Sequence, residues 1–406
     1  MRELSVPANI PPVSSGNVTD QIEDLFARNP QFPSVSIQTD DEWSTITAAQ
    51  FREQVRNVAK GLIAEGLNAG DRIAILSRTR YEWTVADYAI WYAGCVTVPI
   101  YETSSPEQVE WIVSDSHVVA TFFEAQRTTH AFQPIAAKVP HMTRSYIFSD
   151  DVLAELARKG ANVSDSELES RRTSAGPSDP ATLIYTSGTT GQPKGCIITH
   201  GNLISEVDTL VKAVPEVFDV PEASTLIFLP LAHVFGRLIQ VAMLRGEVTI
   251  GHCPNPTALL KDLGSFKPTF LLAVPRVFEK VFNGSAAKAH EASPVKGKIF
   301  DRAAATAIAY SEALDHGHVS KGLSIKHGLF DKLVYSKLRH AMGGRVTHAI
   351  SGGAALGSRL GHFYRGIGLI ILEGYGLTET TAGSTLNLPS ALKIGSVGRP
   401  LPGTGA

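Results

Sequence analysis

Residues 185–195 read YTSGTTGQPKG and lie between two apolar runs, 181–184 and 196–198. Each apolar run is typical of a buried strand, so the segment is predicted to form a loop between two strands. Glycines let backbone N–H groups approach a ligand, hydroxyls donate hydrogen bonds, and Lys194 supplies a fixed positive charge. This combination predicts a loop that binds the phosphates of a nucleotide.

The spacing within this loop excludes two common nucleotide sites. A Walker A loop needs a glycine followed directly by lysine and then Ser or Thr, whereas Lys194 follows Pro193 and precedes Gly195. The dinucleotide pattern G-x-G-x-x-G is missing, and the segment after the loop is typical of a strand rather than a helix. A plain solvated turn is the remaining alternative, but such a turn has no need of hydroxyls and a lysine together.

Composition places the chain among soluble globular proteins. Its 406 residues suffice for two or three packed lobes, and 37 basic side chains nearly balance 39 acidic ones, which argues against nucleic acid as a partner. Cys95, Cys196 and Cys253 are scattered, which favours a reducing cytosol over a disulfide framework or a zinc site. Without a signal-peptide pattern or an 18-residue apolar run, the chain is expected to be cytoplasmic, or at most peripheral on the inner face of a membrane.

Strands and helices are expected to alternate along the chain. This alternation predicts mostly parallel sheets covered by helices. The polar stretch 164–180 suggests two lobes, at about residues 1–170 and 178–406. A helix-rich insertion is expected near 296–342; its lysines favour a solvated face over contact with a phosphate-bearing partner. The expected strands are 72–77, 95–100, 118–123, 225–229 and 270–274, and the expected helices are 47–66, 81–94, 200–214 and one from 105.

Two later segments carry further candidate site residues. Residues 372–380 read LEGYGLTET, and the glycines beside Tyr375 leave its ring free to meet a flat ligand such as adenine. Thr378 offers a hydroxyl, and Glu379 a carboxylate able to bind Mg²⁺. Residues 350–355 read ISGGAA, which lets a nucleobase lie close to the backbone, although tight strand-to-helix packing explains that segment equally well.

In the order TSGTTGQPKG, SGGAAL and EGYGLTET, these segments closely resemble the adenylate-forming superfamily of acyl-CoA synthetases, luciferases and peptide-synthetase adenylation domains. The resemblance covers nearly the whole chain. The segments YEW at 81–83, VTVPIY at 96–101, LPLAHVFGR at 229–237 and VPRVFEK at 274–280 look most like bacterial long-chain fatty-acid–CoA ligases.

The resemblance implies an α/β fold with two helix-covered, mostly parallel sheets packed in layers and a smaller β-barrel-like lobe. It also implies that Thr378 bonds the α-phosphate, Glu379 binds Mg²⁺, and His233 lies beside the α-phosphate and the acyl carboxylate. Arg237 and Arg276 receive no role, because structural ion pairs would explain them equally well. The remaining implied contacts are Thr186, Ser187, Gly188, Thr189, Thr190 and Lys194 with the β- and γ-phosphates, and Gly352, Gly353, Ala354, Glu373, Gly374 and Tyr375 with adenine.

The implied reaction is activation of a fatty carboxylate by ATP and Mg²⁺, followed by transfer to coenzyme A. Two alternatives stay open: an adenylating domain that delivers its acyl group to a carrier protein, and a non-catalytic adenylate-binding module. The chain stops at Ala406, before the ribose-binding Asp and the mobile C-terminal domain of the family. We therefore expect a large N-terminal domain with little or no turnover. Acyl chain length and oligomeric state are not predicted.

Overall fold

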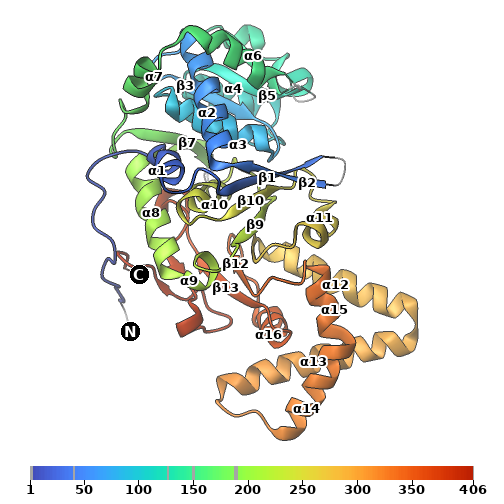
Figure 1. Cartoon of the computed structure of the whole chain (residues 1–406). Coiled ribbons are helices and arrows are strands. Elements are labelled where there is room, and N and C mark those ends of the chain that lie inside the picture. The colour runs from blue at the N-terminus through green and yellow to red at the C-terminus, as the bar shows by residue number, and fades with distance from the viewer. Residues whose placement is uncertain (1–2, 40–41, 126–127, 149–150, 187–190, 406) are drawn as a thin grey trace.

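Three mostly parallel sheets form the core of the computed structural model, which describes residues 3–39, 42–125, 128–148, 151–186 and 191–405. Figure 1 shows the first sheet and its helices at the top, the other two below, and a group of helices that projects from the body. This arrangement confirms the expected α/β class with helix-covered parallel sheets. No helix within the described ranges is long and apolar enough to cross a membrane.

The six-stranded sheet is covered by helices on both faces. Ile73 and Ile75 of its central strand pack into one apolar cluster with residues of α2 and α3, whereas Ala74 and Leu76 point into a second cluster with α4. Neighbouring strands are parallel except the last pair, β7 and β8, which is antiparallel. In spatial order the strands are β6 (Arg144–Phe148), β5 (Val118–Glu124), β3 (Arg72–Leu76), β4 (Val96–Ile100), β7 (Pro180–Thr186) and β8 (Lys194–Thr199). The helices of this part are α2 (Ala48–Ala64), α3 (Tyr81–Tyr92), α4 (Pro106–Asp115), α6 (Val152–Lys159) and α7 (Asp165–Arg172).

Local sequence explains where these helices begin. Thr47 accepts a hydrogen bond from the backbone N–H of Gln50, whose side chain accepts one in return from the N–H of Thr47, so α2 starts with a capping box. Ser105 and Gln108 form the same box at α4, where Pro106 occupies the first helical position. These are the helix starts expected at 47 and 105.

A four-stranded sheet and a five-stranded sheet complete the core. The four-stranded sheet is parallel apart from its β1–β2 hairpin, and the five-stranded sheet is parallel from β11 to β13 and antiparallel from there to β15. Among the described residues, the five-stranded sheet is open, with β11 and β15 at its two ends, and the smaller β-barrel-like lobe stays a prediction. The strands are β2 (Glu42–Thr47), β1 (Pro33–Thr39), β10 (Thr249–His252) and β9 (Ser224–Ile227), then β11 (Phe270–Ala273), β12 (His348–Ser351), β13 (Ile370–Tyr375), β14 (Thr385–Leu386) and β15 (Arg399–Pro400). The associated helices are α1 (Asp20–Arg28), α8 (His200–Ala213), α9 (Pro215–Phe218), α10 (Val234–Arg245), α11 (Leu259–Phe266) and α16 (Ser358–Gly366).

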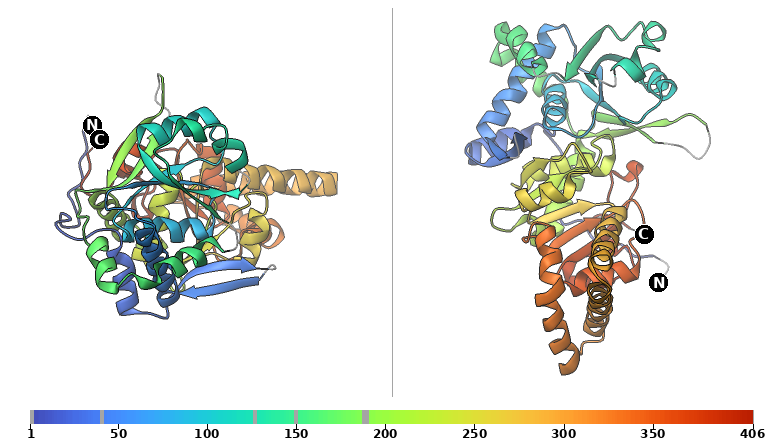
Figure 2. Two further views of the ribbon diagram at one scale, coloured as in Figure 1. Left: turned by 90° about the horizontal axis from the view of Figure 1, so that it is seen from above. Right: turned by 90° about the vertical axis from the view of Figure 1, so that its right-hand side faces the viewer.

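The segment expected to be helix-rich is a helical projection, which we call the arm. It consists of α12 (Pro275–Ala292), α13 (Pro294–Asp315), α14 (Lys321–Phe330), a π-helical turn (Asp331–Tyr335) and α15 (Ser336–Ala341). The arm extends away from the three sheets in Figure 1 and in the side view of Figure 2, with α13 packed on α12 and α16. The lobe boundary predicted between residues 170 and 178 stays a prediction. β7 and β8 follow it and belong to the same sheet as the strands before it.

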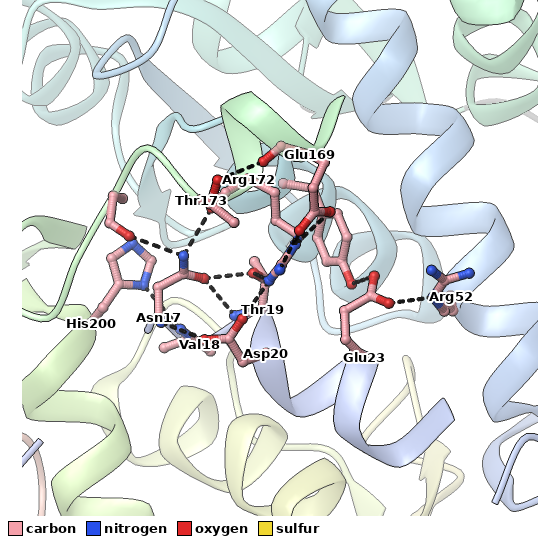
Figure 3. A network of polar contacts seen from close by, with 12 residues as sticks. Asn17, Val18, Thr19, Asp20, Glu23, Arg52, Glu169, Arg172, Thr173 and His200 are labelled. Carbon is pink, nitrogen blue, oxygen red and sulfur yellow. Dashed lines mark hydrogen bonds and ion pairs between the residues drawn. The ribbon is translucent and has the colours of Figure 1, made fainter. Parts of the chain in front are cut away.

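A polar network ties the N-terminal segment to two helices of the body (Figure 3). The side-chain amide of Asn17 donates to the carbonyl of Arg172, 2.8 Å away, and the Arg172 guanidinium donates to the Thr19 hydroxyl at 2.9 Å. The N–H of Val18 donates to Nδ1 of His200. Burial lowers the pKa of His200 to about 4, so its ring stays neutral and can accept this bond. The network fixes the start of α8, which runs on toward the cavity described below.

A buried ion pair joins α10 to the six-stranded sheet. Arg237 and Asp87 are 1 % and 0 % exposed, and the guanidinium donates to the carboxylate at 2.7 Å. The same guanidinium donates to the hydroxyl of Thr182 on β7, and the carboxylate accepts from Thr97 on β4 and from Gln240 on α10. The indole rings of α3 lie on the guanidinium, 5.3 and 5.1 Å from its central carbon. Arg237 is therefore a structural residue.

Removing one partner of this pair should be severely destabilising. The substitution Asp87→Ala leaves a charge buried without compensation, and we expect a loss of about 3–5 kcal/mol in the free energy of unfolding. Urea unfolding followed by circular dichroism measures the loss. The exposed pair Arg28–Glu247 supplies the control, since Arg28→Ala should cost no more than about 1 kcal/mol. Equal, small losses in the two variants would show that the buried pair is dispensable.

Candidate functional site

One cavity of about 760 Å³ collects residues from segments far apart in the sequence. The ends of β7 and β12 and the start of β8 contribute to it, together with α8, the first turn of α10 and the turn after β13. Two of the strands involved, β12 and β13, are parallel neighbours whose carboxyl ends meet at the cavity, a common position for ligand sites in α/β proteins. Within the described part of the chain, no group of three or more His, Cys, Asp or Glu residues is placed to hold a metal ion by itself.

The end of β7 and the start of β8, which flank the segment rich in glycine and threonine, both lie at this cavity. Thr186 and Lys194 are opposite each other in the antiparallel ladder, and both line the cavity. The indole N–H of Trp111 donates to the carbonyl of Pro193 at 2.8 Å and so anchors the end of the loop. The Lys194 side chain is exposed and forms no ion pair with the residues that the structure describes. The predicted contacts of Ser187, Gly188, Thr189 and Thr190 lie outside the described residues.

The two glycine-rich segments meet on another wall. Gly352, Gly353, Gly374 and Tyr375 line the cavity, and the Tyr375 side chain is 53 % exposed. A side chain at Gly374 would place its Cβ 2.8 Å from the carbonyl oxygen of Thr385, so the glycine permits the close pairing of β13 with β14. The wall thus combines bare backbone with one accessible aromatic ring, a surface suited to a flat ligand.

Two residues predicted for this wall lie elsewhere. Ala354 is exposed outside the cavity lining. Glu373 is 8 % exposed, and its Oε1 accepts from the N–H of Leu356 at 2.8 Å. Its carboxylate therefore holds in place the loop after β12, and this loop carries the glycines of the wall.

The turn after Tyr375 presents Thr378 and Glu379 to the cavity. Both lie in a short 3-10 helix, Thr378–Thr380, whose start is capped by the Thr380 hydroxyl bonded to the N–H of Leu377. The turn closes through Ala382 at a φ of +86°, a left-handed conformation that is costly for a residue with a side chain. Glu379 is exposed and has no ion-pair partner among the described residues. An unpaired carboxylate is an oxygen ligand of the kind that a hard divalent cation takes, so among the residues of this turn Glu379 is the one able to hold such an ion.

His233 combines a structural contact with a position on the cavity. It is the N-cap of α10, and its Nδ1 accepts from the N–H of Phe235 at 3.1 Å. Partial desolvation lowers the pKa of the imidazole, so the neutral form that accepts this bond prevails. Beside it, the apolar side chains of Phe235 and Leu238 continue the lining. Arg276 is exposed in the first turn of α12, outside the cavity lining.

Glu206 is a cavity residue that the sequence motifs did not indicate. It projects from α8, and its Oε1 accepts from the N–H of Gly383 at 3.1 Å, which connects α8 to the end of the turn that carries Thr378 and Glu379. Burial raises the pKa of the Glu206 carboxyl to about 8, and the hydrogen bond from Gly383 offsets this rise only in part. In the sequence, Glu206 looks like any partly exposed residue of a helix. Only the fold shows that it lines the cavity.

Comparison with known proteins places the cavity in a wider group. Residues 22–406 match the model of a family described as AMP-binding enzyme. A long-chain-fatty-acid–CoA ligase, FadD15 of Mycobacterium bovis, is 45 % identical over 99 % of this chain and 67 % of the relative. Long chain acyl-CoA synthetase 4 of Arabidopsis thaliana is 33 % identical over 88 % of this chain and 55 % of its own length. The chain thus spans about two thirds of the length of the mycobacterial relative.

Solved structures share the fold at lower identity. The N-terminal domain of FACL13 from Mycobacterium tuberculosis superposes with a TM-score of 0.70 at 22 % identity, covering 95 % of this chain and 82 % of that one. ATP-bound MatB from Rhodopseudomonas palustris gives 0.69 at 24 % identity, covering 95 % of this chain and 65 % of that one.

The raised pKa of Glu206 should make stability depend on pH. The unfolded chain releases this proton near pH 4.5, whereas the folded chain keeps it up to about pH 8, so folding loses stability as pH rises between these values. The substitution Glu206→Gln keeps an acceptor for Gly383 and removes the titration. The difference between the free energy of unfolding of this variant and that of the native protein should therefore grow as pH rises. We expect this difference to increase by up to about 1.4 kcal/mol per pH unit.

Urea unfolding at pH 5.5, 6.5 and 7.5 measures this difference. The exposed Glu53 serves as control, and Glu53→Gln should differ from the native chain by a constant amount. A difference between Glu206→Gln and the native chain that stays constant with pH would show that Glu206 is ionised throughout.

Proposed function

The chain belongs to the AMP-binding enzyme family, and from this premise we propose that its cavity binds ATP and converts a long-chain fatty carboxylate into an acyl-adenylate for transfer to coenzyme A. The observation that carries the proposal is the convergence of Lys194, Tyr375, Thr378 and Glu379 on one cavity. The name of the FadD15 relatives supports a fatty acid as substrate and coenzyme A, rather than a carrier protein, as acceptor.

In this proposal, different residues bind the different parts of the nucleotide. Lys194 and Thr186, with the hydroxyls of Ser187, Thr189 and Thr190 and the backbone of Gly188, contact the β- and γ-phosphates, and Thr378 bonds the α-phosphate. Adenine lies between the bare backbone of the glycine-rich wall and the ring of Tyr375. Glu379 would hold Mg²⁺, which neutralises charge on the phosphates. A binding module without catalysis would have no use for this carboxylate beside the phosphates.

The fatty carboxylate occupies the cavity beside His233. Apolar side chains that follow His233 in the lining, Phe235 and Leu238 among them, offer a surface for the start of the acyl chain. A neutral imidazole in this place donates or accepts a hydrogen bond without adding charge, and its ring is oriented by the bond from Phe235. His233 therefore orients the carboxylate toward the α-phosphorus.

Alignment and charge neutralisation suffice for the chemistry. The carboxylate is ionised at neutral pH, so it needs no general base. One of its oxygens bonds to the α-phosphorus as the bond from phosphorus to the bridging oxygen breaks and pyrophosphate leaves. In the second step the sulfur of coenzyme A loses its proton to solvent and bonds to the acyl carbon, and AMP leaves with the electron pair of the broken C–O bond. Lys194 and the threonine hydroxyls stabilise the charge that develops on the phosphate oxygens.

A cytoplasmic location remains part of the proposal. The three cysteines are unpaired in the structure, and two of them are buried, which agrees with a reducing compartment.

Replacing Lys194 should weaken the binding of ATP but not that of AMP. Because Lys194 is assigned to the outer phosphates, Lys194→Ala should weaken ATP binding about 10- to 100-fold, the loss expected for a charge-assisted phosphate contact, and leave AMP binding nearly unchanged. Isothermal titration of the 406-residue chain with each nucleotide measures both affinities. The exposed Lys288 on α12 supplies the control, and Lys288→Ala should change neither. Equal losses for ATP and AMP would place Lys194 away from the outer phosphates.

The effect of Mg²⁺ on the affinity for ATP should depend on the carboxylate of Glu379. We expect Mg²⁺ to strengthen ATP binding to the native chain and to have at least about tenfold less effect on Glu379→Gln, whose amide is a poor ligand for the ion. The same titrations, with Mg²⁺ or with EDTA, give the comparison. ATP binding that is independent of Mg²⁺ in the native chain would favour a non-catalytic module over a ligase.

A further inference from the structure

The outer helix of the arm bears an apolar stripe that is largely exposed. Ile325, Leu329 and Leu333 are 75 %, 56 % and 47 % exposed. They follow one another at intervals of four residues along α14 and the π-helical turn, so they lie side by side on one face. Isolated exposed aliphatic residues are common, but three neighbours on the outside of a projecting helix form a continuous surface.

The opposite face of the same helix is well packed. The imidazole of His327 stacks on Tyr310 of α13 with ring centroids 3.9 Å apart, and its Nε2 lies 2.6 Å from the carbonyl oxygen of Gly366. Phe330 is buried beside it. These contacts hold α14 on the arm in a fixed orientation, so the stripe is presented outward by a helix that does not need it for its own packing.

Lysines surround the stripe. Lys321, Lys326, Lys332 and Lys337 are exposed, and their ammonium groups form no ion pair with any residue that the structure describes. Residues 316–340 contain five Lys or Arg and one acidic residue, whereas the whole chain has 37 against 39. The acidic residue, Asp331, is paired with Arg339 at 2.7 Å. This end of the arm is therefore positively charged on a protein that is slightly negative.

We propose that this face of the arm docks on an anionic lipid surface, with Ile325, Leu329 and Leu333 inserted at the boundary of headgroups and acyl chains and the four lysines against the lipid phosphates. An aliphatic stripe flanked by lysines is the pattern of helices that lie in a membrane interface. A protein partner fits less well, because the stripe has no Trp, Tyr or Arg of the kind that anchors protein interfaces.

Docking of the arm on a membrane would matter for the supply of substrate. The arm leads from β11 back to β12, whose end lines the cavity, and its outer helix lies far from the first sheet (Figures 1 and 2). If the proposed function is right, docking would hold the chain at the membrane in which long-chain fatty acids dissolve. This use rests on the proposed function, whereas the docking itself does not.

Vesicle flotation without nucleotide tests the docking independently of ATP binding. The 406-residue chain should float with vesicles of phosphatidylcholine that contain roughly 30 % phosphatidylglycerol, and much less with phosphatidylcholine alone or in high salt. Replacing the stripe by Ile325→Ser, Leu329→Ser and Leu333→Ser should lower partitioning at least about tenfold. Replacing the four lysines by glutamine should reduce it to the level seen with phosphatidylcholine, and replacing them by arginine should preserve it.

A matched control uses three apolar residues of comparable exposure elsewhere, Leu4, Leu260 and Val295, replaced together by serine. This variant should float like the native chain. Failure of the native chain to bind anionic vesicles, or equal binding by the stripe and control variants, would overturn the proposal. So would a dimer of the native chain in light scattering that the stripe variant abolishes, because the stripe would then bind a second copy.

Discussion

The buried ion pair between Arg237 and Asp87 is the contact on which the geometry of the cavity depends. Two opposite charges sealed from water tolerate little displacement, because each loses its compensation when the other moves. Through Thr182 the pair fixes β7, which ends at Thr186 on the cavity, and through the backbone of α10 it fixes His233 at the start of that helix. The two indole rings of α3 hold the guanidinium between them. One desolvated interaction thereby sets the distance between the polar loop and the opening of the apolar lining.

The cavity itself separates charge from apolar surface. Lys194 and Glu379 supply opposite charges at its polar part, whereas Phe235 and Leu238 line another part without charge. Glu206 fits this division, since its raised pKa keeps it neutral in the physiological range and allows it to hold the N–H of Gly383 without repelling phosphate. A reaction that joins a fatty carboxylate to a nucleotide needs both kinds of surface in one site. The same division recurs on the arm, where an aliphatic stripe lies among lysines.

Much of the fold and several site residues could be predicted because their sequence signals are local. Strand and helix starts follow from apolar periodicity and caps such as Thr47. Lys194, Tyr375, Thr378 and Glu379 belong to short motifs and line the cavity, whereas their contacts with a ligand stay predictions. Glu373 and Ala354 lie in the same motifs but not in the cavity lining, because the fold sets the direction of each side chain, and Glu373 accepts a hydrogen bond from Leu356.

Glu206 and the stripe on α14 depend on tertiary placement. Nothing in the sequence near Glu206 indicates that its helix faces the turn after β13. The lysines of residues 296–342 favoured a plain solvated face, because the packed side of α14 could not be told from its outer side before α13 was placed. The predicted phosphate contacts of Ser187, Gly188, Thr189 and Thr190 are not tested by the described residues.

A crystal structure of the chain with a non-hydrolysable palmitoyl-adenylate analogue tests the central claim most directly. The account predicts the adenine ring against Tyr375 and Gly353, the phosphate beside Thr378, and the acyl chain leaving past His233; a ligand bound outside this cavity would contradict it.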